Sequence, residues 1–200
     1  MPLILSKPAA YTLEEKRSKF LAYCAPITDE KEAKQILETI RTEHKTASHH
    51  VYAYSLRCNI VRFSDDGEPQ GTAGMPVLNV FQKMGVTDFV CVVTRYFGGT
   101  LLGAGGLVRA YTKSAKGALE AAEPQELVLS KQYLVACEYP QLDRVKYQFD
   151  KWRVEILTIN YTDNCQMVVC VQDDLAEPFL QGKFYIFEEL TPTSPSSSPF

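Results

Sequence analysis

Near its middle the chain reads Phe89-Val90-Cys91-Val92-Val93-Thr94-Arg95-Tyr96-Phe97-Gly98-Gly99-Thr100-Leu101-Leu102-Gly103-Ala104-Gly105-Gly106. Its first five residues are all apolar, a pattern typical of a strand that is covered on both faces. Five glycines then follow, and from Leu107 to Ala122 apolar residues return at helical spacing. The stretch therefore predicts a buried strand that leads through a glycine-rich turn into a helix.

The glycine-rich turn is also the main candidate for a ligand site. Glycine lets backbone N–H groups turn toward a ligand, and a helix N-terminus carries about half a positive charge, so the geometry suits phosphate. Basic side chains near the turn would add full charges. The candidate binding residues are Arg95, Tyr96, Phe97, Gly98, Gly99, Gly103, Gly105, Gly106, Arg109 and Lys113.

Two other interpretations of the turn bear on this hypothesis. Gly98 and Gly103 have the spacing of a Walker motif, but Ala104 and Gly105 occupy the positions of its Lys and Ser or Thr. The sequence therefore does not predict a nucleotide triphosphatase. The same glycines would also suit a tight turn that lets the helix pack closely on a sheet.

The segments before this stretch predict further strands and helices of one domain. Residues 12–24 are typical of extended structure, and Thr28 is expected to cap a helix that carries apolar residues at positions 33, 36, 37 and 40. Residues 50–55 alternate in polarity, and 60–63 are expected to return as their partner strand. A short helix is expected over Pro76–Met84.

A second candidate site is the acidic loop, which reads Ser64-Asp65-Asp66-Gly67-Glu68-Pro69-Gln70-Gly71-Thr72-Ala73-Gly74. Crowded carboxylates raise at least one pKa, and Asp65, Asp66 and Glu68 would be able to hold a divalent cation or act as general acid and base. His50 is the candidate that would assist them. The alternative is an Asp-Gly turn followed by Thr72 as a helix cap.

Other candidates for chemistry are weaker. His49 and His50 point to opposite faces if they lie on a strand, so only one of them would approach the glycine-rich turn. Tyr52, Tyr54, Tyr96 and Phe97 would be able to stack on single-stranded bases, although such residues are more often part of a core. No nucleophile elbow accompanies Ser48 or Ser64. We therefore assign no catalytic residue and expect no metal and no cofactor.

The second half of the chain predicts a separate small domain. Strands are expected over residues 132–138, 153–161, 166–172 and 184–190, and the second and third of these form a hairpin. Helices are expected over 140–151 and 173–181, the first starting at Pro140 and the second closed by Gly182. This β-α-β-β-α-β order is typical of the ferredoxin-like arrangement. The expected α+β organisation comprises domains at 1–123 and 127–190 and a disordered tail at 191–200, with the boundary at Glu123-Pro124-Gln125-Glu126.

Composition excludes several classes of protein. The chain has 200 residues, 46% of them hydrophobic, so a folded core is expected, and no stretch is long enough to span a membrane. Its six cysteines form no C-x-x-C pair, which favours free thiols in the reducing cytoplasm and argues against zinc binding. The net charge is −3, yet residues 1–123 carry +2 and residues 124–200 carry −5. An anionic ligand is therefore expected to meet the first half.

Three runs resemble the bacterial YigZ proteins and the C-terminal part of eukaryotic IMPACT. They are Ser48-His49-His50, the run from Phe63 to Gly74, and the run from Val93 to Gly103. The resemblance covers roughly residues 10–122 and implies a first domain similar to the second domain of a small-subunit ribosomal protein. It implies that the last domain is similar to the C-terminal domain of elongation factor G. Eukaryotic IMPACT regulates translation through an additional N-terminal domain that this chain lacks, so that pathway is not implied here.

Two hypotheses follow, and we favour the first. A non-enzymatic, translation-associated regulator would bind RNA or the ribosome through the glycine-rich turn. Alternatively, a small hydrolase or transferase would act on a phosphorylated or peptide-like metabolite, using the acidic loop. A regulator that acts through protein contacts of the acidic second domain is a third interpretation. The sequence does not specify the oligomeric state.

Overall fold

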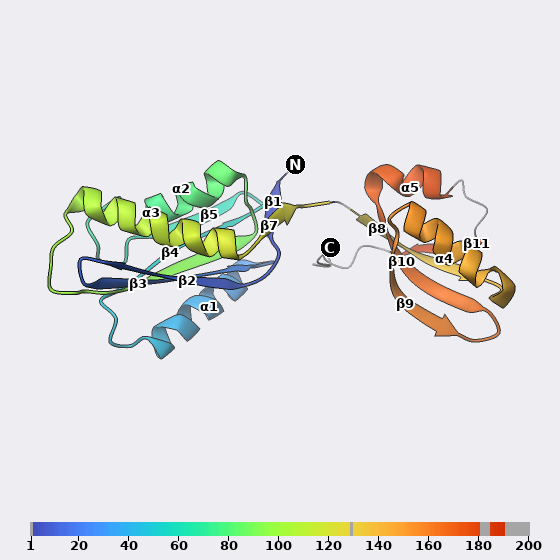
Figure 1. Cartoon of the computed structure of the whole chain (residues 1–200), viewed down its shortest axis with the longest axis horizontal. Coiled ribbons are helices and arrows are strands. Elements are labelled where there is room, and N and C mark those ends of the chain that lie inside the picture. The colour runs from blue at the N-terminus through green and yellow to red at the C-terminus, as the bar shows by residue number, and fades with distance from the viewer. Residues whose placement is uncertain (1, 129, 181–184, 191–200) are drawn as a thin grey trace. The chain divides into compact units, whose positions relative to one another are not determined.

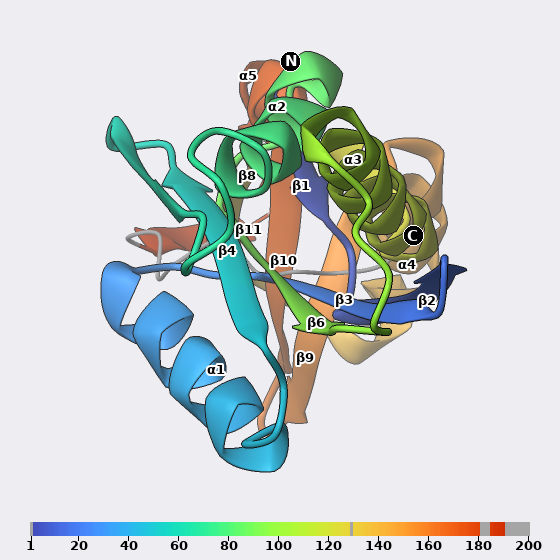
Figure 2. The ribbon, with the colours of Figure 1, turned by 90° about the vertical axis from the view of Figure 1, so that its left-hand side faces the viewer.

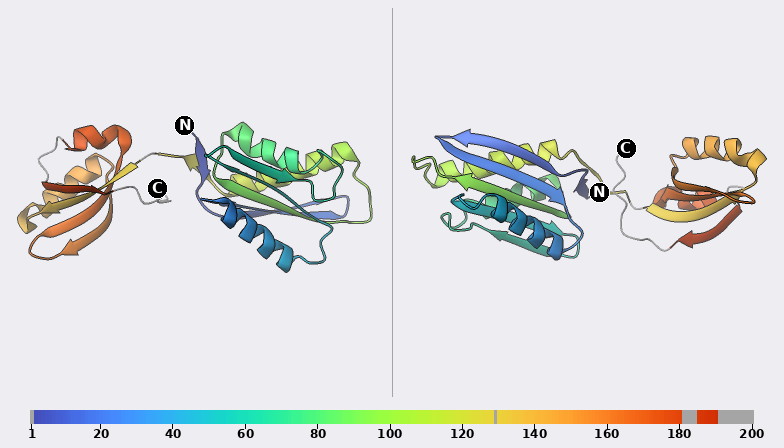
Figure 3. Two further views of the ribbon diagram at one scale, coloured as in Figure 1. Left: turned by 180° about the vertical axis from the view of Figure 1, so that it is seen from behind. Right: turned by 90° about the horizontal axis from the view of Figure 1, so that it is seen from below.

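The computed structural model describes residues 2–128, 130–180 and 185–190. The chain divides into two compact units, residues 1–127 and residues 128–200 (Figures 1 and 3). Each combines an antiparallel sheet with helices, so the protein has the expected α+β class. Along the described part of the chain, no helix has the length and hydrophobicity needed to cross a membrane.

A five-stranded antiparallel sheet forms the centre of the first unit. Its strands run in the order β2-β3-β6-β4-β5. Their bounds are Ala9–Glu15 (β2), Ser18–Pro26 (β3), Phe89–Tyr96 (β6), His49–Leu56 (β4) and Ile60–Ser64 (β5). The middle strand β6 is buried along residues 89–95, which confirms the strand predicted from the apolar run.

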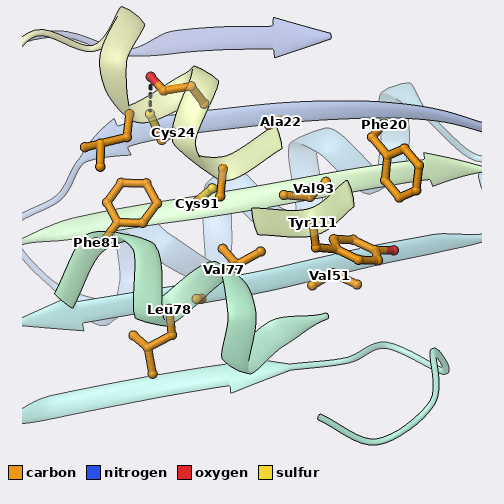
Figure 4. Close-up of a cluster of buried hydrophobic side chains, with 14 of the residues drawn as sticks. Phe20, Ala22, Cys24, Val51, Val77, Leu78, Phe81, Cys91, Val93 and Tyr111 are labelled. Carbon is orange, nitrogen blue, oxygen red and sulfur yellow. Dashed lines mark hydrogen bonds between the residues drawn. The ribbon is translucent and has the colours of Figure 1, made fainter. Parts of the chain in front are cut away.

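Helices cover this sheet on both faces. Figure 2 shows α2 (Gly74–Met84) and α3 (Ala104–Ala121) on one face and α1 (Glu30–Glu43) on the other. The larger core lies beneath α2 and α3, where Val77 and Tyr111 meet Phe20, Val51 and Val93 of the strands (Figure 4). A smaller core lies beneath α1. The alternation of side chains along each strand therefore decides which helices a residue faces.

The helix starts differ from those expected. Asp29, not Thr28, is the N-cap of α1, because its carboxylate accepts a hydrogen bond of 2.8 Å from the amide of Glu32. Helices α2 and α3 begin at Gly74 and Ala104, two and three residues earlier than the apolar pattern indicated. Glycine has a low helix propensity, so a sequence reading underestimates helix in a glycine-rich segment.

A pair of short strands ends the first unit. Strand β1 (Leu3–Leu5) pairs antiparallel with β7 (Pro124–Glu126), and Leu5 is completely buried. The segment expected to be the domain boundary, residues 123–126, thus contains a strand of the first unit, which extends to Leu127. The pairing joins residues about 120 positions apart, so local sequence patterns do not reveal it.

The second unit has the ferredoxin-like β-α-β-β-α-β order. Its bounds are Ser130–Cys137 (β8), Leu142–Lys151 (α4), Glu155–Tyr161 (β9), Cys165–Gln172 (β10), Asp173–Leu180 (α5) and Tyr185–Leu190 (β11). The strand order β11-β8-β10-β9 is that of the ferredoxin-like sheet. Val145 and Phe149 of α4 share one core with Phe179 of α5 and with strands β8 and β10.

The second unit differs from the prediction at the start of its first helix and matches it at the hairpin. Pro140 lies in a short 3-10 turn at Tyr139–Gln141, and α4 begins only at Leu142. The hairpin between β9 and β10 forms as expected, with the amide of Thr162 donating to the carbonyl of Asn164 at 3.0 Å. The helix end at 181–182, the first residue of the last strand and the tail at 191–200 lie outside the described residues.

Candidate nucleic-acid interface

The glycine-rich turn, residues 97–103, leaves the end of β6 and leads to the exposed start of α3. Gly103 is the N-cap, with φ of 72°, and no side chain caps the helix. The first amides of an α-helix have no acceptor within the helix, and the first turn of α3 contains no acidic residue. Ala104 and Gly105 are exposed. The start of α3 therefore presents backbone N–H groups and the positive end of an 18-residue helix dipole to solvent.

A basic hollow lies beside this helix start. It has a volume of about 260 Å³ and is lined by Leu13, Glu15, Lys16, Leu102, Gly106, Arg109, Ala110 and Lys113. The guanidinium of Arg109 reaches back over the first turn of α3, because a Cβ atom on Gly105 would lie 3.8 Å from its Nη1. Arg109 and Lys113 are one helical turn apart, so they act on the same face. Arg109 and Lys113, which the sequence predicted to bind a ligand, thus both line the hollow, and ligand binding by them stays a prediction.

The β2–β3 hairpin adds two cations that the sequence reading missed. Lys16 and Arg17 form its two-residue loop, between the paired residues Glu15 and Ser18. Both have positive φ, 47° and 67°, a conformation that costs an ordinary residue about 1–2 kcal/mol. Such loops usually contain Asn or Gly, so Lys-Arg gave no turn signal. The two-residue connection between the paired strands requires these φ values, which Lys16 and Arg17 adopt at this cost.

The hairpin tip and α3 carry four cations whose charges have no partner among the residues that the structure describes. In the described ranges, Lys16, Arg17, Arg109 and Lys113 form no ion pair. Glu15 also lines the hollow, which leaves an excess of positive charge. We call these four residues and the start of α3 the basic surface.

Arg95 does not belong to this surface, contrary to expectation. Its side chain is only 6% exposed, and Nη1 donates to the carboxylate of Glu68 at 2.6 Å. Tyr111 donates to the same oxygen at 2.8 Å. The guanidinium also lies 5.4 Å from the ring centroid of Phe20 and 5.5 Å from that of Phe97. Arg95 thus holds the sheet, the acidic loop and α3 together.

Two amides of the turn are likewise used internally. The amide of Phe97 donates to Ser48 Oγ at 3.3 Å, and that of Gly98 donates to Ser18 Oγ at 3.2 Å. The outward-facing amides therefore come from the start of α3 rather than from the beginning of the turn. Gly99 and Gly103 provide the positive φ values, 79° and 72°, that the chain needs between these positions.

The three carboxylates of the acidic loop point to separate partners. Asp65 accepts hydrogen bonds from the amides of Gly71, Ala73 and Gly74 at 2.8–3.0 Å and so caps α2 from a distance. Asp66 accepts from the amide of His50 at 2.6 Å, and Glu68 is held by Arg95. The sequence predicted a shared acidic site, but these contacts distribute the charges over structural tasks. In the part of the chain that is described, no group of three or more His, Cys, Asp or Glu side chains is arranged to hold a metal.

One interpretation of this loop expected Thr72 to cap α2, but Thr72 does not cap this helix. Its hydroxyl donates to the carbonyl of Pro69 at 2.6 Å, and the N-cap position belongs to Ala73, which has no capping side chain. The long-range cap from Asp65 replaces it. A cap eight and nine residues away in the sequence follows no local capping pattern, so sequence reasoning could not find it.

The two adjacent histidines point to opposite faces of the sheet, as predicted, and contact different residues. His49 Nδ1 lies 2.8 Å from the carbonyl oxygen of Asp66, and its Nε2 lies 3.9 Å from Glu68. His50 Nδ1 instead lies 3.2 Å from Thr94 Oγ1 on the α1 face. Burial lowers the pKa of His50. The His50 side chain thus contacts Thr94, while its backbone amide donates to Asp66. The expectation that His50 assists the acidic residues stays a prediction.

Only one of the four candidate stacking aromatics is well exposed. Tyr52 and Tyr54 stack on each other, 6.1 Å apart, beside the core under α1. Tyr96 places its hydroxyl 2.9 Å from His44 Nδ1. Phe97 is 48% exposed, and Leu101 in the same turn is 82% exposed. The turn thus offers one aromatic and one aliphatic side chain beside the basic surface.

Comparison with known proteins places the chain in a family. The model of the Impact N-terminal domain matches residues 16–119. The chain belongs to the IMPACT family. The matched segment contains every residue of the basic surface, the acidic loop and the glycine-rich turn.

Relatives match well beyond this segment. The IMPACT family member from Haemophilus influenzae is 34% identical over 184 residues, which cover 88% of each chain. The IMPACT family member YigZ from Escherichia coli is 36% identical over 163 residues, 80% of each chain. The crystal structure of a hypothetical protein is similar with a TM-score of 0.62 and 32% identity, covering 96% of this chain and 98% of the other. The similarity to IMPACT family members thus includes the second unit.

Proposed function

We propose that this IMPACT family protein is a cytoplasmic, translation-associated regulator that binds RNA, including the RNA of the ribosome, through the basic surface at the start of α3. The observation that carries the proposal is a group of four cations on the hairpin tip and on α3, beside its uncapped start, which form no ion pair within the described part of the chain. The resemblance of the first domain to a small-subunit ribosomal protein domain, and of the second to the C-terminal domain of elongation factor G, supports the biological context. The six cysteines, all free, are consistent with a reducing compartment.

Phosphate recognition follows from the chemistry of this surface. A helix start provides N–H donors and about half a positive charge, and Lys or Arg side chains release counterions when they meet phosphates. Lys16 and Arg17 approach from the β2–β3 hairpin, while Arg109 and Lys113 lie on α3. Because the four charges come from two elements, they suit a ligand with several phosphates better than a single small anion.

Exposed apolar groups in the turn favour RNA with unpaired bases. Phe97 is half exposed, and its ring is supported by the guanidinium of Arg95 on the inner side. A base stacked on an aromatic side chain contributes about 1–3 kcal/mol. Single-stranded segments and loops offer such bases, whereas paired regions do not. The proposal therefore commits to single-stranded RNA segments.

Fluorescence anisotropy with a labelled 20-nucleotide RNA of mixed sequence tests the proposal. Arg109→Ala combined with Lys113→Ala should weaken binding and reduce the salt dependence by about two phosphate contacts. The matched control is Lys31→Ala with Lys34→Ala, which removes the same charge from exposed positions of α1 on the other face of the sheet. An equal loss in both pairs, or no loss in the first, would contradict the proposal.

Ribosome association forms the second readout. The intact chain should sediment with ribosomal subunits at low salt, and the Arg109 and Lys113 double variant should not. Arg95→Ala is unsuitable here because Arg95 is buried in the fold. A separate prediction, that the acidic second unit contacts a protein, is tested by removing residues 128–200. Ribosome association that survives the α3 variant but not the truncation would favour that alternative.

A further inference from the structure

A second concave site lies on the opposite face of the five-stranded sheet. Helix α1 packs against β4 and β6. Residues of β2, β3 and α1 line an open groove alongside the helix, with a volume of about 450 Å³. This volume lies within the range of small-molecule sites. Because α3 covers the other face, the groove is separate from the basic surface.

The lining of the groove is mainly apolar. Leu21 and Tyr23 of β3 form part of its floor, and Ile36 and Ile40 of α1 form a wall. These side chains are only partly buried, apart from Ile40, so a ligand would remove further apolar surface from water. Burial of such surface contributes about 25 cal/mol per Å². The groove can therefore hold a hydrophobic body.

Polar groups gather around one part of the groove. Thr94 is fixed by His50, and His44 is fixed by the hydroxyl of Tyr96. Glu43, the last residue of α1, also lines the groove. Among the lining residues Glu43 alone carries a formal charge, because histidine is counted as neutral at pH 7. The groove thus carries a negative formal charge, whereas the basic surface on the other face of the sheet carries positive charges.

The Glu43 carboxylate influences the pKa of Tyr23, which forms part of the floor of the groove. Burial raises the pKa of Tyr23 above its ordinary value, and the nearby Cys24 thiol and Glu43 carboxylate raise it further. In the described ranges Glu43 forms no ion pair, so its charge is available to a ligand. A cation placed beside both groups would gain a carboxylate and an aromatic face together.

We propose that this groove binds a small molecule that carries a protonated amine on an apolar, preferably aromatic, body. The body would lie between Ile36 and Leu21, and the amine would meet Glu43 and Tyr23. An acid of the same shape would be repelled by the carboxylate. This proposal is independent of RNA binding, since it uses different residues on the other face of the sheet.

Amide-resolved NMR titration of the full chain tests the groove with three probes of equal skeleton. Tryptamine is cationic, tryptophol is neutral and indole-3-acetate is anionic. Tryptamine should shift signals of α1, β2, β3 and Thr94 and bind about tenfold more tightly than tryptophol. Indole-3-acetate should bind more weakly than either. The absence of shifts, or shifts confined to other surfaces, would overturn the proposal.

A charge variant and a matched control separate the two parts of the proposal. Glu43→Gln should remove the preference for tryptamine over tryptophol while keeping the shifts in the groove. Glu120→Gln removes the same charge from an exposed position on α3 and should change nothing. Shifts in the groove that are equal for all three probes would refute the amine specificity. Ile36→Trp, which fills the groove from its wall, should abolish binding of every probe; undiminished binding would refute the location.

Discussion

A Cβ atom on Gly98 would lie 2.0 Å from the carbonyl carbon and oxygen of Arg17. The glycine-rich turn and the tip of the β2–β3 hairpin are therefore in backbone contact, and Gly98 is required for close approach. This contact fixes the tip of the hairpin, which carries Lys16 and Arg17, against the turn that precedes α3. Backbone atoms cannot rotate away as a side chain would.

Gly98→Ala should consequently destabilise the protein by about 3 kcal/mol or more, because overpacking against backbone has no inexpensive relief. Urea unfolding measures the loss. Gly99→Ala is the matched control: its φ is 79°, but no atom lies within 4 Å of the added Cβ. This control should lose only about 1–2 kcal/mol for its left-handed conformation. Equal losses in both variants would show that the contact with Arg17 is unimportant.

Glu68→Ala should cost about 3–5 kcal/mol in the free energy of unfolding, since it leaves the buried guanidinium of Arg95 without its counterion. The Tyr111 hydroxyl loses its acceptor as well. Thermal and urea unfolding are the measurements. The exposed pair of Lys116 and Glu120, 3.6 Å apart, is the control, and Glu120→Ala should change stability by less than about 1 kcal/mol. A similar small effect at Glu68 would contradict the assigned role.

Asp65→Ala should shorten or loosen the start of α2. Asp65 caps three amides, whereas Asp29 caps a single amide of α1, so the loss at Asp65 should be the larger of the two. A single capping contact contributes about 1 kcal/mol. Hydrogen exchange at Ala73 and Gly74, together with urea unfolding of both variants, tests this order. A greater loss for Asp29→Ala would refute it.

Stability should decrease as the pH falls below about 6.5, the ordinary pKa of histidine. Burial lowers the pKa of His50 in the folded state; Arg41 and His44 act in the same direction, while Asp66 opposes them. Above this pH the ring is neutral in both states. Below it the unfolded chain binds the proton first, so unfolding becomes easier until the folded pKa is passed.

His50→Gln should flatten that decrease, because the substituted side chain binds no proton in either state. Urea unfolding at pH 7.5 and pH 5.5, in the wild-type chain and the variant, gives the comparison. An unchanged difference between the two pH values in the variant would assign the effect to other groups.

Local patterns predicted the elements that depend on local or periodic signals. The apolar run at residues 89–93 indicated β6, and the order of strands and helices after residue 130 indicated the ferredoxin-like unit. The glycines pointed to an unusual backbone before α3. These features follow from hydrophobic periodicity and from the conformational freedom of glycine, both of which are properties of short segments.

The roles of individual charges could not be predicted in the same way. Arg95, Glu68 and Tyr111 are 16 to 43 positions apart, and only the fold brings them into one buried cluster. Asp65 lies near the beginning of the acidic loop, and the rest of this loop separates it in sequence from the helix that it caps. Lys16 and Arg17 gave no turn signal, since their positive φ values are imposed by the pairing of β2 with β3.

The sequence by itself determined the order of the secondary-structure elements, the family resemblance and the segment that carries the glycines together with Arg109 and Lys113. Only the tertiary structure decided which cations face solvent. A charge is stable in the interior when an opposite charge compensates its lost hydration, and that partner comes from a distant part of the chain. Arg95 has such a partner in Glu68, whereas Arg109 has none among the described residues and remains at the surface, where a ligand can reach it.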